Sequence, residues 1–405
     1  MVGGAQMLFN LVSQFTPNTY ALLTLPTSIY SSGNLSNNWL PCTYYFSNNA
    51  TLYQDDPLRT SKTHAVHKID LLEKCVKRIG TVMVLREILN FLGLIKNIFQ
   101  FVRVGLKVAK KEKFSSILGL SDQGIAMISS FILSKLLKIP LSYFLFDIYR
   151  GNDLPFPLNL AARLLEHQLF KHAKHLIVNN EGTQIYLSQC YPEFKKKMSL
   201  VQNSVLPESY ESARVSYDPH PPYLIIYTGN VSWPQEQALT NLLLAMDELT
   251  DLALILNLYI PKPTLLIKTL VNTRSNVFLT SAPQSEMPKI QSQATLLFLP
   301  LSWNTKAPSI IATATPGKMT DYLGSGRPML VHAPSYAYVG QYVRQYKLGI
   351  VVDQNDPAIL AETIRTFLEH PLAGNIYIAN ALRHFYKNHD ARKNGRLMEK
   401  ILQSI

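Results

Sequence analysis

The fold of this chain is decided by one stretch, Pro-Gly-Lys-Met-Thr-Asp-Tyr-Leu-Gly-Ser-Gly-Arg-Pro, at residues 316–328. Pro316 and Gly317 break the preceding chain and predict the first turn of a helix, which a pair of glycines ends before a strand. Free N–H groups at a helix start, with Lys318 in the first turn, make a site for phosphate. Asp321 lies three residues further on the same helix face, where a carboxylate can accept hydrogen bonds from a ribose diol.

Strand-length apolar runs alternate with amphipathic runs on both sides of this stretch, which is the pattern of βαβ units around a parallel sheet. We expect helices at residues 125–137, 159–172, 236–249, 357–369 and 375–403. The expected strands are residues 20–24, 42–46, 116–120, 141–146, 175–178, 198–202, 223–227, 253–258, 277–280, 295–298, 328–332 and 349–352.

Four prolines and little periodicity make residues 205–222 the best linker. We expect an N-terminal domain over residues 1–204, a second domain over 223–380, and a C-terminal helix over 381–405 that can pack back on the first domain. Two consecutive α/β halves predict two doubly wound domains that face each other across a cleft. In such folds a ligand binds at the carboxyl ends of the strands.

The composition excludes several classes of protein. Of the 405 residues, 47% are apolar and 16% are charged, which is too apolar for intrinsic disorder and too mixed for a multi-span membrane protein. The three cysteines, Cys42, Cys75 and Cys190, are far apart, so we expect neither a zinc site nor a disulfide scaffold. Asp55 and Asp56 lie in a polar loop and do not form a metal motif. We therefore expect a cytoplasmic protein without a metal.

Positive charge is concentrated in the first half of the chain. Residues 1–204 hold 22 basic and 12 acidic side chains, against 17 and 15 in residues 205–405. Residues 62–113 alone hold 12 basic and 4 acidic side chains. Within them, residues 91–114 interleave bulky apolar and basic side chains, which is typical of a helix lying on an anionic membrane surface, here the inner face of the membrane. The alternative is a core-packing helix with a solvated basic face. No nucleic-acid motif accompanies the charge, so we expect no nucleic-acid partner.

The stretch at residues 316–328 resembles the donor-binding segment of family 4 glycosyltransferases of the GT-B fold, Pro-x-Lys-x-x-Glu-Tyr-x-x-x-Gly-x-Pro. Lys318 falls at the lysine of that pattern. Asp321 stands where the family has the glutamate that holds the nucleotide ribose, and its side chain is one methylene shorter. Thr313 stands where the family often has a second glutamate. The alternative interpretation of this segment is a capped helix with a charged surface.

Other segments match the same family. Tyr227-Thr228-Gly229-Asn230 resembles the glycine-containing loop that faces the donor phosphates, although residues 231–235 lack the arginine and lysine that often follow it. Thr280-Ser281-Ala282-Pro283 resembles the loop that lines the base, and Val201-Gln202-Asn203-Ser204 the segment that closes the first domain. Gly3-Gly4 followed by residues 7–15 resembles the family's Gly-Gly loop and first helix. An apolar strand precedes that loop in the family, so we expect the first strand of the N-terminal domain to be missing here.

The resemblance implies the GT-B fold and transfer of a sugar from a nucleotide-diphospho-sugar to a glycan or lipid-linked acceptor. It further implies retention of configuration, no metal, no cofactor beyond the donor, and a role in polysaccharide or glycoconjugate biosynthesis. The residues it assigns to donor binding are Gly229, Asn230, Ser281, Pro316, Gly317, Lys318 and Asp321. Asp147 and Lys318 are the catalytic candidates, and Gly3, Gly4, Asp122 and Asn179 are the candidates on the acceptor or sugar side.

Structural alternatives remain for several of these assignments. Asp147 and Asp122 each follow a predicted strand, where an aspartate also serves as a helix cap or a loop residue. We expect His384 and His389 to be solvated on the basic terminal helix. The alternative functions are a non-catalytic nucleotide-sugar-binding or scaffold subunit of the same fold, and a sugar-nucleotide epimerase.

Overall fold

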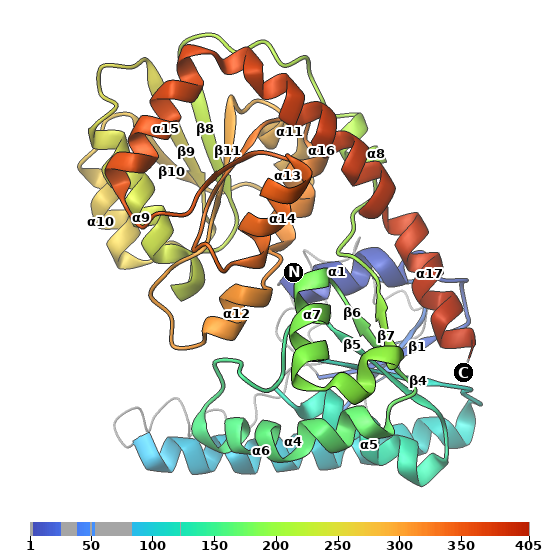
Figure 1. Cartoon of the computed structure of the whole chain (residues 1–405). Helices are drawn as coiled ribbons and strands as arrows, with labels where there is room; N and C mark the ends of the chain where they lie inside the picture. Colours follow the sequence, from blue (N-terminus) through green and yellow to red (C-terminus); the bar gives the residue numbers. More distant parts are fainter. Residues whose placement is uncertain (1–2, 26–38, 49–50, 53–82, 122, 405) are drawn as a thin grey trace. The chain divides into compact units, whose positions relative to one another are not determined.

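The computed structural model describes residues 3–25, 39–48, 51–52, 83–121 and 123–404 (Figure 1). The candidate residue Asp122 lies outside these ranges, as does the basic region before residue 83. The chain forms two compact units: Met1–Val201 together with Gly395–Ile405, called unit 1, and Gln202–Asn394, called unit 2.

Unit 2 is built on a six-stranded parallel sheet with the order β10-β9-β8-β11-β12-β13. Its strands are short apolar runs because both faces of a parallel sheet are covered by helices. They are β8 (Tyr223–Thr228), β9 (Leu254–Tyr259), β10 (Val277–Thr280), β11 (Leu296–Pro300), β12 (Met329–His332) and β13 (Ile350–Val352). Since β8 has β9 on one side and β11 on the other, the strand order reverses beside β8.

Helices cover both faces of this sheet. One core joins the sheet to α9 (Trp233–Asp247), α10 (Leu265–Asn272) and α15 (Pro357–Glu369). The other core joins it to α12 (Pro308–Thr313), α13 (Gly317–Gly324), α14 (Tyr338–Tyr346) and α16 (Gly374–Asn388), and α11 (Met287–Gln291) adds Ile290 to the same side. The predicted strands and the two-layer covering of unit 2 are therefore confirmed.

The described residues of unit 1 form two separate sheets. The parallel sheet β4-β5-β6-β7 is made of β4 (Ile117–Leu120), β5 (Leu141–Leu145), β6 (His175–Val178) and β7 (Met198–Leu200). The smaller sheet is β1-β2-β3, in which β1 (Ala21–Thr24) runs parallel to β2 (Thr43–Phe46), and β3 (Thr51–Leu52) is antiparallel. Every predicted strand of this half is present.

Two groups of helices enclose the sheets of unit 1. The long helix α4 (Met83–Lys111) packs with α5 (Ile125–Leu137) and α6 (Phe156–His172) in one layer (Figure 1). Helix α1 (Gly3–Val12) and the end of α17 (Ala391–Gln403) share a core with β2, β5 and β6. The short helix α7 (Glu181–Cys190) follows β6.

The predicted helix at residues 375–403 is two helices, α16 and α17, with a break at His389 and Asp390. The break forms because Val205 donates its N–H to the His389 carbonyl and accepts one from Ala391. His389 is 2% exposed, and its Nδ1 donates to the Asn203 carbonyl at 2.7 Å. The expectation that His389 is solvated is therefore wrong.

Two further expectations need correction. Gly3 and Gly4 begin helix α1 instead of forming a loop ahead of it. A Cβ atom on Gly4 would lie 2.7 Å from the ring of Phe146, so glycine lets this helix approach the end of β5 closely. His384 is also not solvated, because it is only partly exposed and bonds to Tyr342.

Helix α4 presents different faces to the protein and to its surroundings. Leu94, Phe101, Val104 and Val108 are buried against the rest of unit 1. Five large apolar side chains between residues 88 and 99 remain exposed: Ile88, Phe91, Leu92, Ile95 and Phe99. We call these five residues the outer apolar face of α4. None of the helices in the described ranges, α4 included, combines the length and apolar character needed to cross a bilayer.

A pair of glycines in unit 2 allows a test of how closely β12 and β13 approach each other. A Cβ on Gly349 would lie 2.4 Å from the backbone oxygen of Met329, whereas one on Gly340 would lie 3.5 Å from the Val351 side chain. A backbone oxygen cannot rotate away, so Gly349→Ala should lower the free energy of unfolding by about 1–3 kcal/mol. The control Gly340→Ala, inside α14, should leave it unchanged or raise it by up to about 1 kcal/mol. Urea unfolding measures both, and equal midpoints would contradict the described approach of β12 to β13.

Candidate functional site

The two main motifs of unit 2 meet at the carboxyl end of β8. Gly229 follows β8 with φ of 121°, a left-handed conformation that favours glycine. Lys318, in the first turn of α13, reaches over this loop, and a Cβ on Gly229 would lie 3.0 Å from its Cε and 3.3 Å from its Nζ. Two requirements therefore select glycine at this position: the backbone angle and the space taken by the lysine.

Tyr227 holds the lysine in place. Lys318 Nζ donates to the Tyr227 hydroxyl at 2.8 Å and lies 4.5 Å from the centroid of the same ring. The Tyr227 hydroxyl donates in turn to the carbonyl of Asn230 at 2.7 Å. The ammonium group, the aromatic ring and the glycine loop thus form one cluster at the edge of the sheet where doubly wound folds bind ligands.

Asp321 is held by a residue of the predicted linker. The hydroxyl of Tyr210, on the short helix α8 (Glu208–Glu211), donates to Asp321 Oδ1 at 2.7 Å. Tyr210 is buried and packs among the core residues of α13 and α16. The segment after residue 205 is therefore part of the packing that fixes Asp321 one helical turn beyond Lys318.

The first turn of α13 leaves backbone N–H groups available for a ligand. No side chain caps this helix at Pro316, and Gly317 is exposed. The N–H of Met319 donates to the Pro316 carbonyl, so the groups ahead of it, on Gly317 and Lys318, are the outward ones. Such groups bind anions because their partial positive charge adds to that of a nearby cation.

Burial shifts the protonation of both charged residues toward neutrality. It lowers the pKa of Lys318 to about 8, an effect that the negative charge of Asp321 opposes. It raises the pKa of Asp321 to about 6, against the hydrogen bond from Tyr210 and the charge of Lys318. Between these two values the site holds an ammonium group and a carboxylate together.

Three polar residues that sequence reasoning did not single out connect β8 to its neighbours. The N–H of Thr228 donates to the Tyr322 hydroxyl at 3.1 Å, and Gln291 Nε2 donates to Thr228 Oγ1 at 3.0 Å. Both Tyr322 and Gln291 are buried. Tyr322 stands at the tyrosine of the family pattern, so the sequence held a signal for it, whereas Gln291 had none.

The side chains of the remaining candidates do not join this cluster. The side chain of Asn230 is exposed beside Gly229. Ser281 is exposed after β10, which β9 separates from β8. Thr313 is buried, and its hydroxyl donates to the Ser309 carbonyl of its own helix.

The candidates of unit 1 gather where β4, β5 and β6 end. Asp147 is exposed after β5, and its N–H donates to Ser121 Oγ at 3.1 Å. Asn179 is 2% exposed, and its Nδ2 donates to the Phe146 carbonyl at 3.1 Å. The ring of Phe146 is also the neighbour of Gly4. Asn179 and Gly4 thus hold the end of β5 beside the exposed Asp147.

A metal centre has no evident ligands in the part of the chain that the structure describes. There, no group of three or more histidine, cysteine, aspartate or glutamate side chains is arranged to hold an ion.

Comparison with solved structures defines the fold. HepE from Anabaena in complex with UDP superposes with a TM-score of 0.66 at 13% identity, over 100% of this chain and 96% of that one. Sucrose-phosphate synthase from Thermosynechococcus elongatus superposes with a TM-score of 0.65 at 13% identity, over 98% of this chain and 91% of that one. The alpha,alpha-trehalose 6-phosphate synthase from Burkholderia multivorans superposes with a TM-score of 0.57 at 11% identity, over 80% of this chain and 78% of that one. No protein-family model and no curated protein sequence matches the chain. The two Rossmann-like units therefore have the GT-B fold found in glycosyltransferases.

The two pKa shifts predict how donor binding depends on pH. The affinity for a nucleotide-diphospho-sugar should be highest between about pH 6 and about pH 8. It should fall as pH rises above that range, because Lys318 loses its charge, and fall below it, because Asp321 gains a proton. Calorimetric titration from about pH 5 to about pH 9 measures this, and a donor sugar is preferable to free nucleoside diphosphate because its phosphates do not titrate there.

The variant Lys318→Met supplies the control. It should bind roughly 10–100-fold more weakly at neutral pH, the equivalent of about 1.5–3 kcal/mol, and lose the alkaline limb of the profile. An alkaline limb that persists in this variant would show that another group carries the charge.

Proposed function

We propose that the chain is a glycosyltransferase that takes its sugar from a nucleotide-diphospho-sugar bound at the carboxyl edge of the unit 2 sheet. One observation carries the proposal. Lys318 Nζ, the loop of Gly229 and the uncapped start of α13 converge where the strand order reverses, with Asp321 one turn further along. Support comes from the fold itself, since HepE is a structural neighbour that holds UDP in one structure and UDP-glucose in another.

The same cluster accounts for the chemistry of the leaving group. When the bond from the sugar to the diphosphate breaks, negative charge develops on the β-phosphate. Lys318 and the N–H groups of Gly317 and Lys318 are placed to stabilise that charge. We propose transfer without a metal or other cofactor, because this ammonium group supplies the positive charge. The carboxylate of Asp321 accepts the ribose hydroxyls.

We assign the acceptor side to unit 1. Asp147, exposed after β5, is proposed to bond a hydroxyl of the reacting sugars. We further propose that the transfer retains the configuration of the sugar. The proposed acceptor is a glycan or a lipid-linked molecule in polysaccharide or glycoconjugate assembly.

A lipid-linked acceptor would place unit 1 at a membrane, and helix α4 has the surface for it. Its outer apolar face exposes Phe99 by 67%, and the exposed Arg103, Lys107 and Lys110 follow along the same helix. On the neighbouring helix α6, Leu164 is also 67% exposed. Apolar side chains that enter the bilayer beside basic ones that meet anionic headgroups are typical of peripheral membrane helices.

Turnover separates an enzyme from a binding subunit. Incubation with UDP-sugars and GDP-sugars should release nucleoside diphosphate, and Lys318→Ala and Asp321→Ala should each lower the rate by at least about 10-fold because each removes a charged contact to the donor. Lys268→Ala, which removes an exposed lysine from α10, should leave the rate unchanged. Donor binding without any turnover would favour the non-catalytic alternative. Wild-type affinity in both site variants would disprove the site.

Vesicle flotation tests the membrane proposal. The protein should float with vesicles that contain phosphatidylglycerol and less with phosphatidylcholine alone. Replacing Ile95 and Phe99 together by serine should weaken this binding by at least roughly 10-fold, because two large apolar contacts with the bilayer are lost. The matched control replaces Leu265 and Leu266, which are exposed on α10 of unit 2, and should bind as the wild type does. Equal binding by both double variants would refute the role of α4.

A further inference from the structure

The carboxylate of Asp321 is bonded at one oxygen and open at the other. The Tyr210 hydroxyl donates to Oδ1 at 2.7 Å, whereas Oδ2 accepts no hydrogen bond from the residues that the structure describes. Burial raises the pKa of Tyr210 well above its usual value, so the hydroxyl keeps its proton and remains a donor. One oxygen is therefore held by the protein, and the other is available to a ligand.

The ring of Tyr210 is fixed tightly against α13. Tyr210 is 4% exposed, and its ring packs edge-on against Phe385 of α16, with 6.1 Å between the centroids. Gly324 lets both rings come close to α13, because a Cβ there would lie 2.9 Å from Phe385 Cζ and 3.1 Å from Tyr210 Cγ. The tyrosine hydroxyl therefore has little freedom to turn away from the carboxylate.

The chain that follows α8 is fastened to the same part of unit 2. Arg214 Nε donates to the carbonyl of Gly324 at 2.7 Å. Arg327 donates to the carbonyls of residues 215 and 216, each at 3.1 Å. These bonds tie the predicted linker to α13 and to the turn after it. Tyr210 thus reaches Asp321 from a docked segment instead of a loose connection.

A hydrogen bond to one carboxylate oxygen has two consequences for the other. It restricts rotation of the carboxylate, so less conformational freedom is lost when a ligand binds. It also favours the ionised form, which is the stronger acceptor for hydroxyl groups. Asp321 is one methylene shorter than the glutamate of the family pattern, and Tyr210 supplies the support for this shorter side chain.

We propose that Tyr210 is a positioning residue of the donor site, whose hydroxyl orients Asp321 so that the open carboxylate oxygen receives the ribose diol. This inference rests on the proposed function, in which Asp321 accepts the ribose hydroxyls. Selection of ribose over deoxyribose then depends on the linker as well as on the stretch at residues 316–328.

Binding of ribose and dideoxyribose nucleotides tests this role. Calorimetric titration compares UDP and GDP with their 2′,3′-dideoxy analogues. The wild type should bind the ribose form of the nucleotide it accepts at least about 10-fold more tightly than the dideoxy form. Tyr210→Phe keeps the ring but removes the hydroxyl. It should lower this preference by at least about 5-fold and leave the affinity for the dideoxy analogue unchanged.

The pH profile is a second measurement, which a loss of packing alone would not shift. Lys318 and Tyr322 of α13 and Tyr210 of α8 act on the charge of Asp321. Burial raises the pKa of both tyrosines, so they do not titrate near neutral pH. Burial also raises the pKa of Asp321 to about 6, although the bond from Tyr210 opposes the rise.

Removal of that bond should therefore move the acid limb of donor binding upward. With UDP-glucose or GDP-glucose, Tyr210→Phe should shift this limb to higher pH by about one pH unit. The alkaline limb, which Lys318 sets, should stay where it is in the wild type.

Two controls separate this role from a general effect on folding. Tyr217→Phe removes another tyrosine hydroxyl of the linker, one that donates to the Thr295 carbonyl at 3.1 Å, and it should keep the wild-type ribose preference and acid limb. In an Asp321→Asn background, Tyr210→Phe should cause no further loss of ribose preference, because the two side chains act as one unit.

Three results would overturn the inference. If Asp321→Asn loses the ribose preference and Tyr210→Phe keeps it, Tyr210 does not position the carboxylate. If Tyr210→Phe weakens the ribose and dideoxy forms equally, its role is structural. If the wild type binds neither UDP, GDP nor their sugars, the proposed function fails together with this inference.

Discussion

The contact between Lys318 and the Gly229 loop is the constraint on which the rest of unit 2 depends. A residue with a Cβ at position 229 would meet the lysine at 3.0 Å and would also be strained by the positive φ. Because the lysine rests on the ring of Tyr227, its charge is placed at the end of β8. The parallel sheet sets where β8 ends, and the two helical layers set where α13 begins. The proposed donor site is the point at which these separate requirements coincide.

Partial burial gives this site its chemical character. An ammonium group in water is strongly hydrated, and its attraction for phosphate is weak. Here burial lowers the pKa of Lys318 and raises that of Asp321, and each charge partly offsets the other. Tyr210 holds the carboxylate by one oxygen, so the side chain is oriented before any ligand arrives. A preoriented pair of opposite charges is suited to bind phosphate at one end and a sugar diol at the other.

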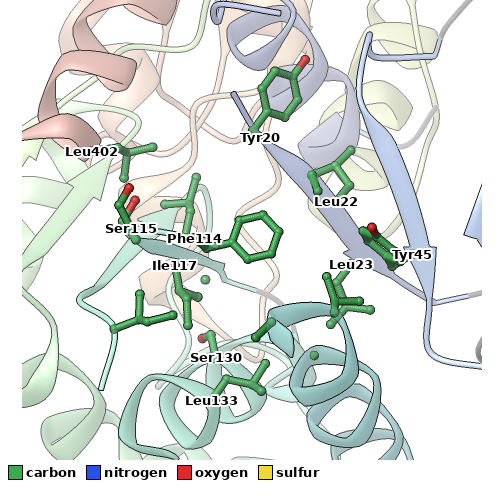
Figure 2. Close-up of a pocket in the computed structure, with 18 of the residues that line it drawn as sticks. Tyr20, Leu22, Leu23, Tyr45, Phe114, Ser115, Ile117, Ser130, Leu133 and Leu402 are labelled. Atoms are coloured by element: carbon green, nitrogen blue, oxygen red, sulfur yellow. The ribbon is translucent and has the colours of Figure 1, made fainter. Parts of the chain in front are cut away.

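Unit 1 differs from unit 2 in how its candidate residues and its core are arranged. Its candidate residue Asp147 is exposed, and the neighbouring Asn179 and Gly4 serve to bring α1, β5 and β6 together. Its surface carries the basic and apolar face of α4, and residues of β1 and β4 line a cavity of about 440 Å³ (Figure 2). Unit 2 has one continuous sheet with two closed cores, whereas the described strands of unit 1 form two sheets whose edge strands β1 and β4 are only partly buried.

The sequence by itself determined most of the strands and the main motif of this protein. Period and length of the apolar runs were enough to place every described strand except the short β3, because these signals are local. The spacing of Pro316, Lys318 and Asp321 is likewise local, and it predicts a phosphate and ribose site. Only the tertiary structure decided what depends on distant partners. Tyr210 reaches Asp321 across 111 positions, and the buried His389 donates a hydrogen bond to the carbonyl of Asn203, 186 positions away. Strands β1 and β4 line the same cavity although they are far apart in the chain, and no local sequence pattern predicts that they meet there.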